Sequence, residues 1–146
     1  MLRGSAEAKI DDKGRLKVPS GFRRYVEETY GRDVFITSVD GDHGVLYPLA
    51  VWEALEARLL TLPSTNLHRQ RYLERTGYFG QQARLDAQGR MVVPTRLRES
   101  AGIDGDVVLL GLGDRVAIWN RERFERRISE RPFTDDDFQA LTAQGV

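Results

Sequence analysis

The feature that most constrains the fold of this chain is an internal repeat. The stretch AKIDDKGRLKVPSGFR, residues 8–23, returns 75 positions later as ARLDAQGRMVVPTRLR, residues 83–98. Seven of the sixteen positions are identical, and others exchange similar side chains. An internal repeat constrains the fold more strongly than the secondary-structure propensity of single residues, and two copies are too few for a solenoid. The repeat therefore indicates a duplicated unit with pseudo-two-fold symmetry.

Each copy of the repeat predicts a tight turn. Asp11 and Gly14 fit the first and fourth positions of a type I turn, and so do Asp86 and Gly89. The aspartate carboxylate can accept hydrogen bonds from backbone N–H groups further along the turn. The glycine can adopt the positive φ that a bulged hairpin needs. We expect these four residues to shape the two turns.

Short strands are predicted on both sides of each turn, and a helix after them. The strands are expected around 9–11, 15–18, 84–86 and 90–93. Pro19 and Pro94 end the strand pairing because proline has no N–H to donate. Ser20 and Thr95 are then predicted to cap the following helices with their side-chain oxygens.

The remaining sequence of each half repeats a second hairpin and a helix. The hairpins are expected over 33–47 and 106–119, and the helices over 49–60 and 120–128; a further helix is expected over 66–76. These elements predict an α+β, mainly β fold in which two half-units form one barrel with flanking helices. The predicted divisions are a first half (1–64), a second half (65–131) and an acidic tail (132–146). In the tail, Thr134 either caps a short acidic helix or belongs to a partly disordered segment.

Charge is segregated along the chain although its formal net charge is zero. Residues 1–32 carry +3 and residues 69–98 carry +5, whereas residues 33–68 and 99–146 each carry −4. The two basic blocks contain the two copies of the repeat. All three lysines, Lys9, Lys13 and Lys17, lie in the first copy. Charge segregation of this kind shapes the electric field around the protein, and that field determines which charged partners the protein attracts.

Strand periodicity gives the repeat one apolar and one charged face. Ile10, Leu16 and Val18 alternate with basic residues, so they are predicted to point inward. The charged face is either a solvated surface or a contact with double-stranded DNA, because a two-stranded ribbon fits a major groove about 12 Å wide. The duplication and the charge segregation favour DNA contact.

Arg15 and Arg90 are the leading candidates for DNA contact, because a guanidinium can bind phosphate or bind guanine with two hydrogen bonds. The alternative is an internal pair with the aspartate of the same turn that stiffens the hairpin, and both roles are compatible. The other candidate DNA-binding residues are Lys9, Lys13, Lys17, Arg84 and Gln88. Arg23, Arg24 and Arg98 are expected on the helices. For these three residues, a solvated face or a contact between subunits is at least as strongly expected as a contact with DNA.

Other classes of protein find no support in the sequence. There is no cysteine, so disulfides and thiolate zinc sites are excluded. No catalytic motif or phosphate-binding glycine loop is present, so we expect no enzyme activity, cofactor, metal or small-molecule substrate. No signal peptide or membrane span is evident, which predicts a cytoplasmic protein. Ordinary surface or packing roles are expected for His43 and His68, and core or subunit-interface roles for the aromatic residues Trp52, Tyr72, Tyr78, Phe79 and Trp119.

The two motifs resemble the DNA-binding hairpin of the AbrB/SpoVT superfamily, whose fold interleaves two such units into a swapped-hairpin barrel. Two copies in one chain, with Trp52 after the first and Trp119 closing the second, resemble the MraZ family. The family's D-x-x-x-R motif falls on Asp11–Arg15 and Asp86–Arg90. The resemblance implies a bacterial transcription regulator of the division and cell-wall gene cluster. Such a regulator binds tandem repeats in its own promoter, assembles into a homo-oligomeric ring and lies on the nucleoid.

Two other functions fit parts of the pattern. The AbrB-like superfamily includes antitoxins, whose tail neutralises a toxin while the barrel binds DNA. A tail of 15 residues with few apolar side chains argues against that role. A ring scaffold without a DNA role is the third possibility, and the clustered lysines argue against it. The first copy carries Lys9, Lys13 and Lys17 where the second has Arg84, Gln88 and Val92, so the two hairpins are expected to contribute unequally.

Overall fold

The computed structural model describes all residues from Met1 to Val146. The first half contains β1 (Ser5–Lys9), β2 (Arg15–Lys17), α1 (Ser20–Tyr30), β3 (Asp33–Thr37), β4 (Gly44–Pro48) and α2 (Leu49–Leu59). The second half contains β5 (Gln81–Arg84), β6 (Arg90–Val92), α4 (Thr95–Ala101), β7 (Asp106–Gly111), β8 (Val116–Asn120) and α5 (Arg121–Glu130). The predicted second half also includes α3 (Leu67–Phe79), which precedes β5, and α6 (Asp135–Ala143) follows α5. None of these helices is both long enough and apolar enough to span a bilayer.

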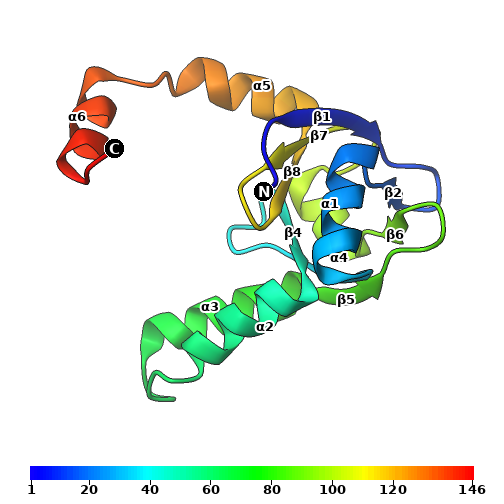
Figure 1. Cartoon of the computed structure of the whole chain (residues 1–146), viewed down its shortest axis with the longest axis horizontal. Coiled ribbons are helices and arrows are strands. Elements are labelled where there is room, and N and C mark those ends of the chain that lie inside the picture. Colours follow the sequence, from blue (N-terminus) through cyan, green and yellow to red (C-terminus); the bar gives the residue numbers. More distant parts are fainter.

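The halves interleave into one α+β domain built on antiparallel sheet (Figure 1). Six strands form a sheet in the order β1-β7-β8-β4-β3-β5, and β2 pairs with β6 in a separate two-stranded ribbon. The edge strand β1 pairs with β7 of the second half, and the edge strand β5 pairs with β3 of the first half. Exchanging the halves maps this order onto itself. The two half-units of the predicted swapped-hairpin fold are therefore present.

The pairing around the turns differs from a simple local hairpin. Within the first copy only an isolated bridge links Ile10 and Leu16, and β2 takes β6 as its partner strand. The strand partner of β1 likewise comes from the other half, since β1 pairs along its length with β7. Each half alone would therefore leave its short strand unpaired, and the duplication supplies the missing partner.

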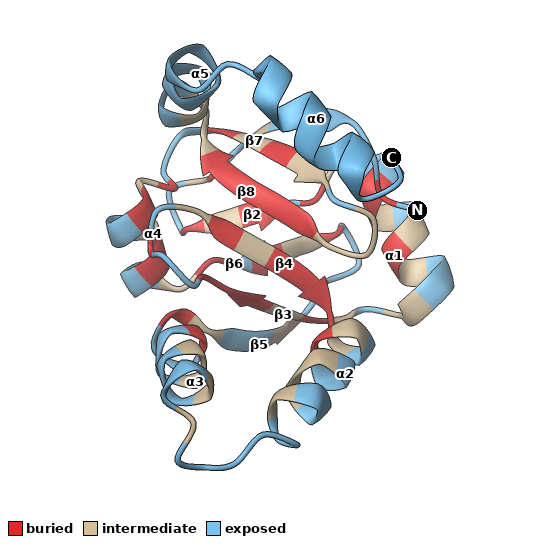
Figure 2. Cartoon of the chain, turned by 90° about the vertical axis from the view of Figure 1, so that its left-hand side faces the viewer, coloured by how far each residue is buried: buried red, intermediate tan, exposed pale blue.

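One apolar core lies between the sheet, the ribbon and the helices α1 and α4 (Figure 2). The inward residues of the repeat, Leu16 and Val18 in the first copy and Met91 and Val93 in the second, are all buried. Phe22 and Val26 of α1 are buried too, as are Leu97 and Ala101 of α4. The helices α3, α5 and α6 are mostly exposed, and together with α2 they extend away from the core (Figure 1).

The predicted side-chain caps at Ser20 and Thr95 are wrong. Both residues already belong to the first helical turn, and the N-cap positions are Pro19 and Pro94, without a side-chain cap. The carbonyl oxygens of these prolines accept the first helical hydrogen bonds, from Arg23 N and Arg98 N, each at 2.9 Å. In the tail, the helical alternative is observed: Thr134 caps α6.

Candidate nucleic-acid interface

The two turns of the repeat have the same internal hydrogen bonds. In the first turn, Asp11 Oδ1 accepts hydrogen bonds from the backbone N–H groups of Lys13 and Arg15, at 2.9 and 2.8 Å. Asp11 Oδ2 accepts a third from Arg15 Nε at 2.8 Å. The turn is closed by Gly14 N, which donates to Asp11 O at 3.0 Å, and Gly14 has a φ of 76°. Asp11 therefore fixes both the backbone of the turn and the guanidinium of Arg15.

The second turn repeats this geometry. Asp86 Oδ1 accepts from the backbone N–H groups of Gln88 and Arg90 at 2.8 and 2.9 Å, and Oδ2 accepts from Arg90 Nε at 3.1 Å. Gly89 has a φ of 75°. In both turns the aspartate uses the arginine's Nε, and no hydrogen bond within the protein involves the terminal guanidinium nitrogens. Those nitrogens remain available to a ligand.

These contacts also lower the pKa of Asp11 and Asp86 below the ordinary value of 3.8. The largest cause at each carboxylate is the hydrogen bond from the backbone N–H of the arginine four residues later. A carboxylate whose pKa is lowered by folding stabilises the native state above its ordinary pKa. That contribution is lost as the pH falls through the lowered folded pKa. Both turns therefore keep their charged clamp at neutral and mildly acidic pH.

Each turn is held in place by the opposite half. The backbone carbonyl of Gly14 accepts a hydrogen bond from Val93 N, and the carbonyl of Gly89 accepts one from Val18 N, both at 2.9 Å. The arginine of the opposite helix then covers each glycine: the Arg98 guanidinium lies over Gly14, and Arg23 lies over Gly89. A side chain at either glycine would collide with this arginine. The two turns consequently form one rigid unit.

Arg23 and Arg98 are positioning residues that sequence reasoning did not single out for this role. Arg23 Nη2 donates a hydrogen bond to Ala87 O of the opposite turn at 2.7 Å, whereas Arg98 Nε donates to Val93 O of its own half at 3.0 Å while its guanidinium lies over Gly14. The sequence did indicate that the two positions are equivalent, because Arg23 and Arg98 occupy the same position in the two copies of the repeat. Helical periodicity could not show that each arginine crosses to the turn of the other half.

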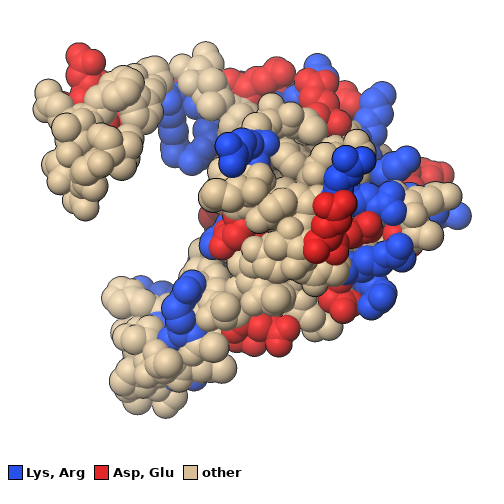
Figure 3. Space-filling view, in the orientation of Figure 1, with Lys and Arg blue, Asp and Glu red and all other residues tan.

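The ribbon between the turns has a basic outer face. Arg15 lies opposite Val92, and Lys17 lies opposite Arg90, whereas Leu16 and Met91 point inward and are buried. No acidic residue lies in either strand of the ribbon. Lys17 is exposed, and about a third of each arginine side chain is exposed. Figure 3 shows several lysine and arginine side chains, with acidic side chains among them, at the end of the molecule where Figure 1 places the two turns.

The other candidate residues surround this ribbon. Lys13 and Gln88 lie in the turns, and both are exposed. Lys9 and Arg84 lie at the ends of the edge strands, with 82% and 69% of their side chains exposed. Each pairs with an aspartate of the other half, Lys9 with Asp106 at 3.9 Å and Arg84 with Asp33 at 3.3 Å. Exposed pairs of this kind hold a side chain only weakly.

Most of the predicted core aromatics are buried away from the ribbon; these are Trp52, Phe79 and Trp119. Tyr72 is half-buried, whereas Tyr78 is exposed and packs against the guanidinium of Arg96. The His43 ring stacks on Trp119, with ring centroids 4.3 Å apart, and His68 is an exposed residue at the start of α3. No three metal-ligating side chains gather anywhere in the structure.

Comparison with known proteins identifies one family. The sequence model of the family described as "MraZ protein, putative antitoxin-like" matches residues 1–75 and 80–144. The chain is 42% identical to "Transcriptional regulator MraZ" of Acidobacterium capsulatum and 41% identical to the protein of that name in Koribacter versatilis. Both matches cover 100% of this chain and 100% of the relative. It is 35% identical to the Chromobacterium violaceum protein of the same name, over 89% of this chain and 88% of the relative.

Proposed function

The chain belongs to the MraZ family, and we propose that it is a sequence-specific DNA-binding transcriptional regulator of the division and cell-wall gene cluster. We propose that its target is a set of tandem repeats in the promoter of its own operon. The observation that carries the proposal is the pair of equivalent turns, each presenting an aspartate-clamped arginine at one end of the molecule. The relatives are named as transcriptional regulators, not as enzymes.

The electrostatics of the ribbon support a polyanionic ligand. Lys17 and Arg90 are cross-strand partners, and like charges in that position destabilise a free sheet. The unfavourable pair is relieved when phosphates approach both side chains. A ribbon of two antiparallel strands also has the width to enter a major groove of about 12 Å. The face that sets two basic side chains opposite each other is thus the face that suits DNA.

The proposed roles follow from the position of each side chain. Arg15 and Arg90 contact bases or phosphates through their terminal nitrogens, which are free of internal partners. The exposed turn residues Lys13 and Gln88 touch the backbone or the bases nearest the turn. Phosphate contacts are assigned to Lys9, Lys17 and Arg84. The carboxylates of Asp11 and Asp86 repel phosphate, so their role is to hold the arginines.

Affinity is proposed to come from several modules acting together. A homo-oligomeric ring presents many copies of the paired turns, and binding at one repeat raises the effective concentration of the next module at the next repeat. This arrangement allows a chain of zero net charge to hold DNA through local basic faces. It also places the protein on the nucleoid.

Salt dependence tests the phosphate contacts. We expect the logarithm of the association constant to fall linearly with the logarithm of salt concentration, since each neutralised phosphate releases counterions. Lys17→Ala is expected to weaken binding equally on all sequences and to reduce the slope by about 1 per engaged module. Fluorescence anisotropy on a promoter duplex at several salt concentrations measures both. A slope near zero, or one unchanged by Lys17→Ala, would contradict the assignment.

A further inference from the structure

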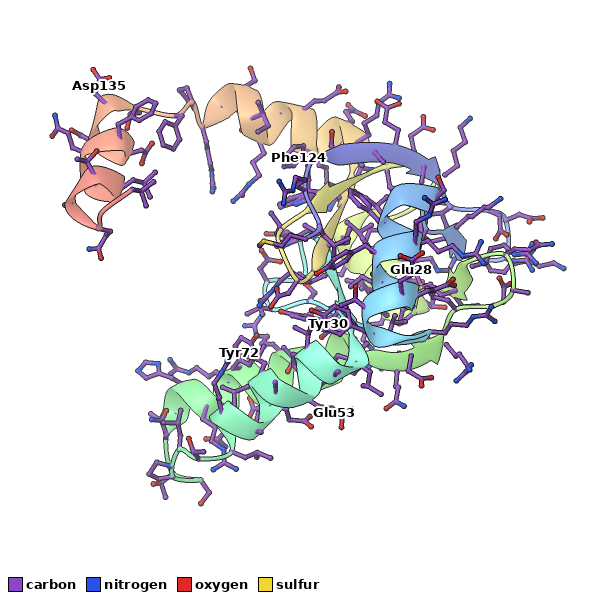
Figure 4. All side chains as sticks on the ribbon, viewed as in Figure 1. Glu28, Tyr30, Glu53, Tyr72, Phe124 and Asp135 are labelled. Carbon is purple, nitrogen blue, oxygen red and sulfur yellow. The ribbon has the colours of Figure 1, made fainter.

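The segment after α5 forms an arm whose residues are not buried against the rest of the chain. Every residue from Arg131 to Val146 is exposed. Its helix α6 has nine residues, and a helix that short is marginal in water without packing. In Figure 4, Asp135 at the start of α6 lies far from the barrel. We call this segment, Arg131–Val146, the arm.

The helical start of the arm is nevertheless well formed. Thr134 Oγ1 accepts a hydrogen bond from Asp137 N at 3.2 Å, and Asp137 Oδ2 accepts one from Thr134 N at 2.9 Å. Phe133 and Phe138 pack edge to face across this cap, with ring centroids 4.6 Å apart, as in a hydrophobic staple. The local sequence therefore builds the helix, but it does not bury its apolar face.

The arm combines an apolar face with acidic charge. Phe133, Phe138 and Leu141 are 59%, 62% and 42% exposed. Phe138 and Leu141 are three residues apart, so they share one side of α6. The first turn of α6 holds Asp135, Asp136 and Asp137, and no lysine or arginine follows Arg131. A complementary surface would be apolar and basic.

The α2–α3 tip has that character. We define the tip as Leu60, Leu62 and Leu67 together with the basic start of α3. The three leucines are 55%, 40% and 59% exposed. The first turns of α3 contain His68, Arg69 and Arg71, and Arg69 Nη1 donates a hydrogen bond to Leu62 O at 2.6 Å, which orders the tip.

The arm does not reach the tip of its own chain. The arm and the α2–α3 pair leave the barrel at separate edges and extend on the same side of the molecule (Figure 1). The apolar residues of the arm stay exposed, so the rest of the same chain does not cover them. Another molecule is therefore needed to cover either surface, and a second copy carries both matching surfaces.

We propose that the arm of one copy binds the α2–α3 tip of a neighbouring copy. Phe138 and Leu141 cover the exposed leucines, and the aspartates of α6 face the basic start of α3. The inference rests on the self-association in the proposed function and names the surfaces that produce it. Because arm and tip are different surfaces, the contact is head-to-tail and generates a ring when the rotation closes. The turns lie at the opposite end of the molecule and stay uncovered (Figure 1).

Two variants, each lacking one surface, test the proposal. The arm variant carries Phe138→Asp and Leu141→Asp, and the tip variant carries Leu62→Asp and Leu67→Asp. Sedimentation velocity is expected to give multiples of 16.6 kDa for the unaltered chain and 16.6 kDa for each variant alone. Leu112→Asp is the matched control, because Leu112 is also 55% exposed but lies in the β7–β8 turn. It should assemble like the unaltered chain.

Mixing the two variants is the decisive step. The tip variant keeps an intact arm and the arm variant keeps an intact tip, so the mixture is expected to form complexes of two chains and nothing larger. This result also shows that both variants are folded. A mixture that stays monomeric, or a variant that assembles by itself like the unaltered chain, would overturn the proposal.

The test of the arm–tip contact can fail independently of the test of DNA binding. If the variants assemble normally while Arg15→Ala impairs DNA binding, the head-to-tail contact is wrong and the proposed function stands. If the unaltered chain is monomeric at every concentration, the contact is refuted, and the DNA titration alone decides the role of the turns. An arm that binds a different protein while self-assembly survives its substitution would support the antitoxin-like alternative instead.

Discussion

Replacing Arg15 by alanine is expected to lower the affinity for the promoter repeats by about 1–3 kcal/mol per engaged module, if Arg15 reads a base. The guanidinium is clamped through Nε, so its terminal nitrogens are already oriented toward a ligand. The protein should remain folded, because Asp11 keeps its two backbone hydrogen bonds after the substitution. The loss should therefore appear in DNA binding and not in the thermal stability.

Anisotropy titrations at one fixed salt concentration measure this effect, with Arg24→Ala as the control. Arg24 is an exposed arginine of the same half, on α1, so its removal changes the net charge equally. We expect its dissociation constant to stay unchanged within error. Arg90→Ala should act in the same direction as Arg15→Ala, and the ratio of their effects gives the contribution of each turn. Unchanged affinity of Arg15→Ala with the oligomer intact would refute the assignment.

Leu16→Ala is expected to destabilise the protein by about 2–5 kcal/mol, since it removes a large buried side chain and leaves a cavity. Leu16 is fully buried on β2, the strand that depends on the other half for its partner. A loss of that size is a large part of the 5–15 kcal/mol of a typical domain. The substitution thus tests whether the ribbon is part of the core.

Urea denaturation followed by circular dichroism measures this loss. Both proteins must be compared at one chain concentration, because self-association adds to apparent stability. Lys17→Ala is the matched control on the same strand, where the side chain is exposed, and it should change stability by less than about 0.5 kcal/mol. A loss under about 1 kcal/mol for Leu16→Ala would mean that the ribbon is not integral to the core.

The sequence predicted best the features that depend on neighbouring residues. The aspartate and glycine of each turn interact within five positions, so spacing alone indicates the hydrogen bonds and the positive φ. The inward positions of Leu16 and Val93 follow from strand alternation in the same way. The resemblance to a swapped-hairpin family supplied the interleaving of the halves.

Features that depend on contacts between the halves were harder to predict. The pairing of β2 with β6 cannot be predicted from either copy of the repeat alone, because the sequence of each copy is typical of a self-contained hairpin. The crossing of Arg23 and Arg98 to the opposite turns depends on where two helices lie in the barrel. The side-chain caps were misassigned because Pro19 and Pro94 take the cap position themselves.

The central claim is that the paired turns make this chain a sequence-specific DNA-binding protein. The most direct test is an anisotropy titration of the unaltered protein on two duplexes of equal length at the same salt concentration. One carries the DNA upstream of the gene, where the proposed function predicts short direct repeats, and the other carries the same bases in scrambled order. We expect the repeats to be bound at least about 1,000-fold more tightly, as for specific over nonspecific sites. Equal affinity for the two duplexes, or no binding to either, would contradict the claim.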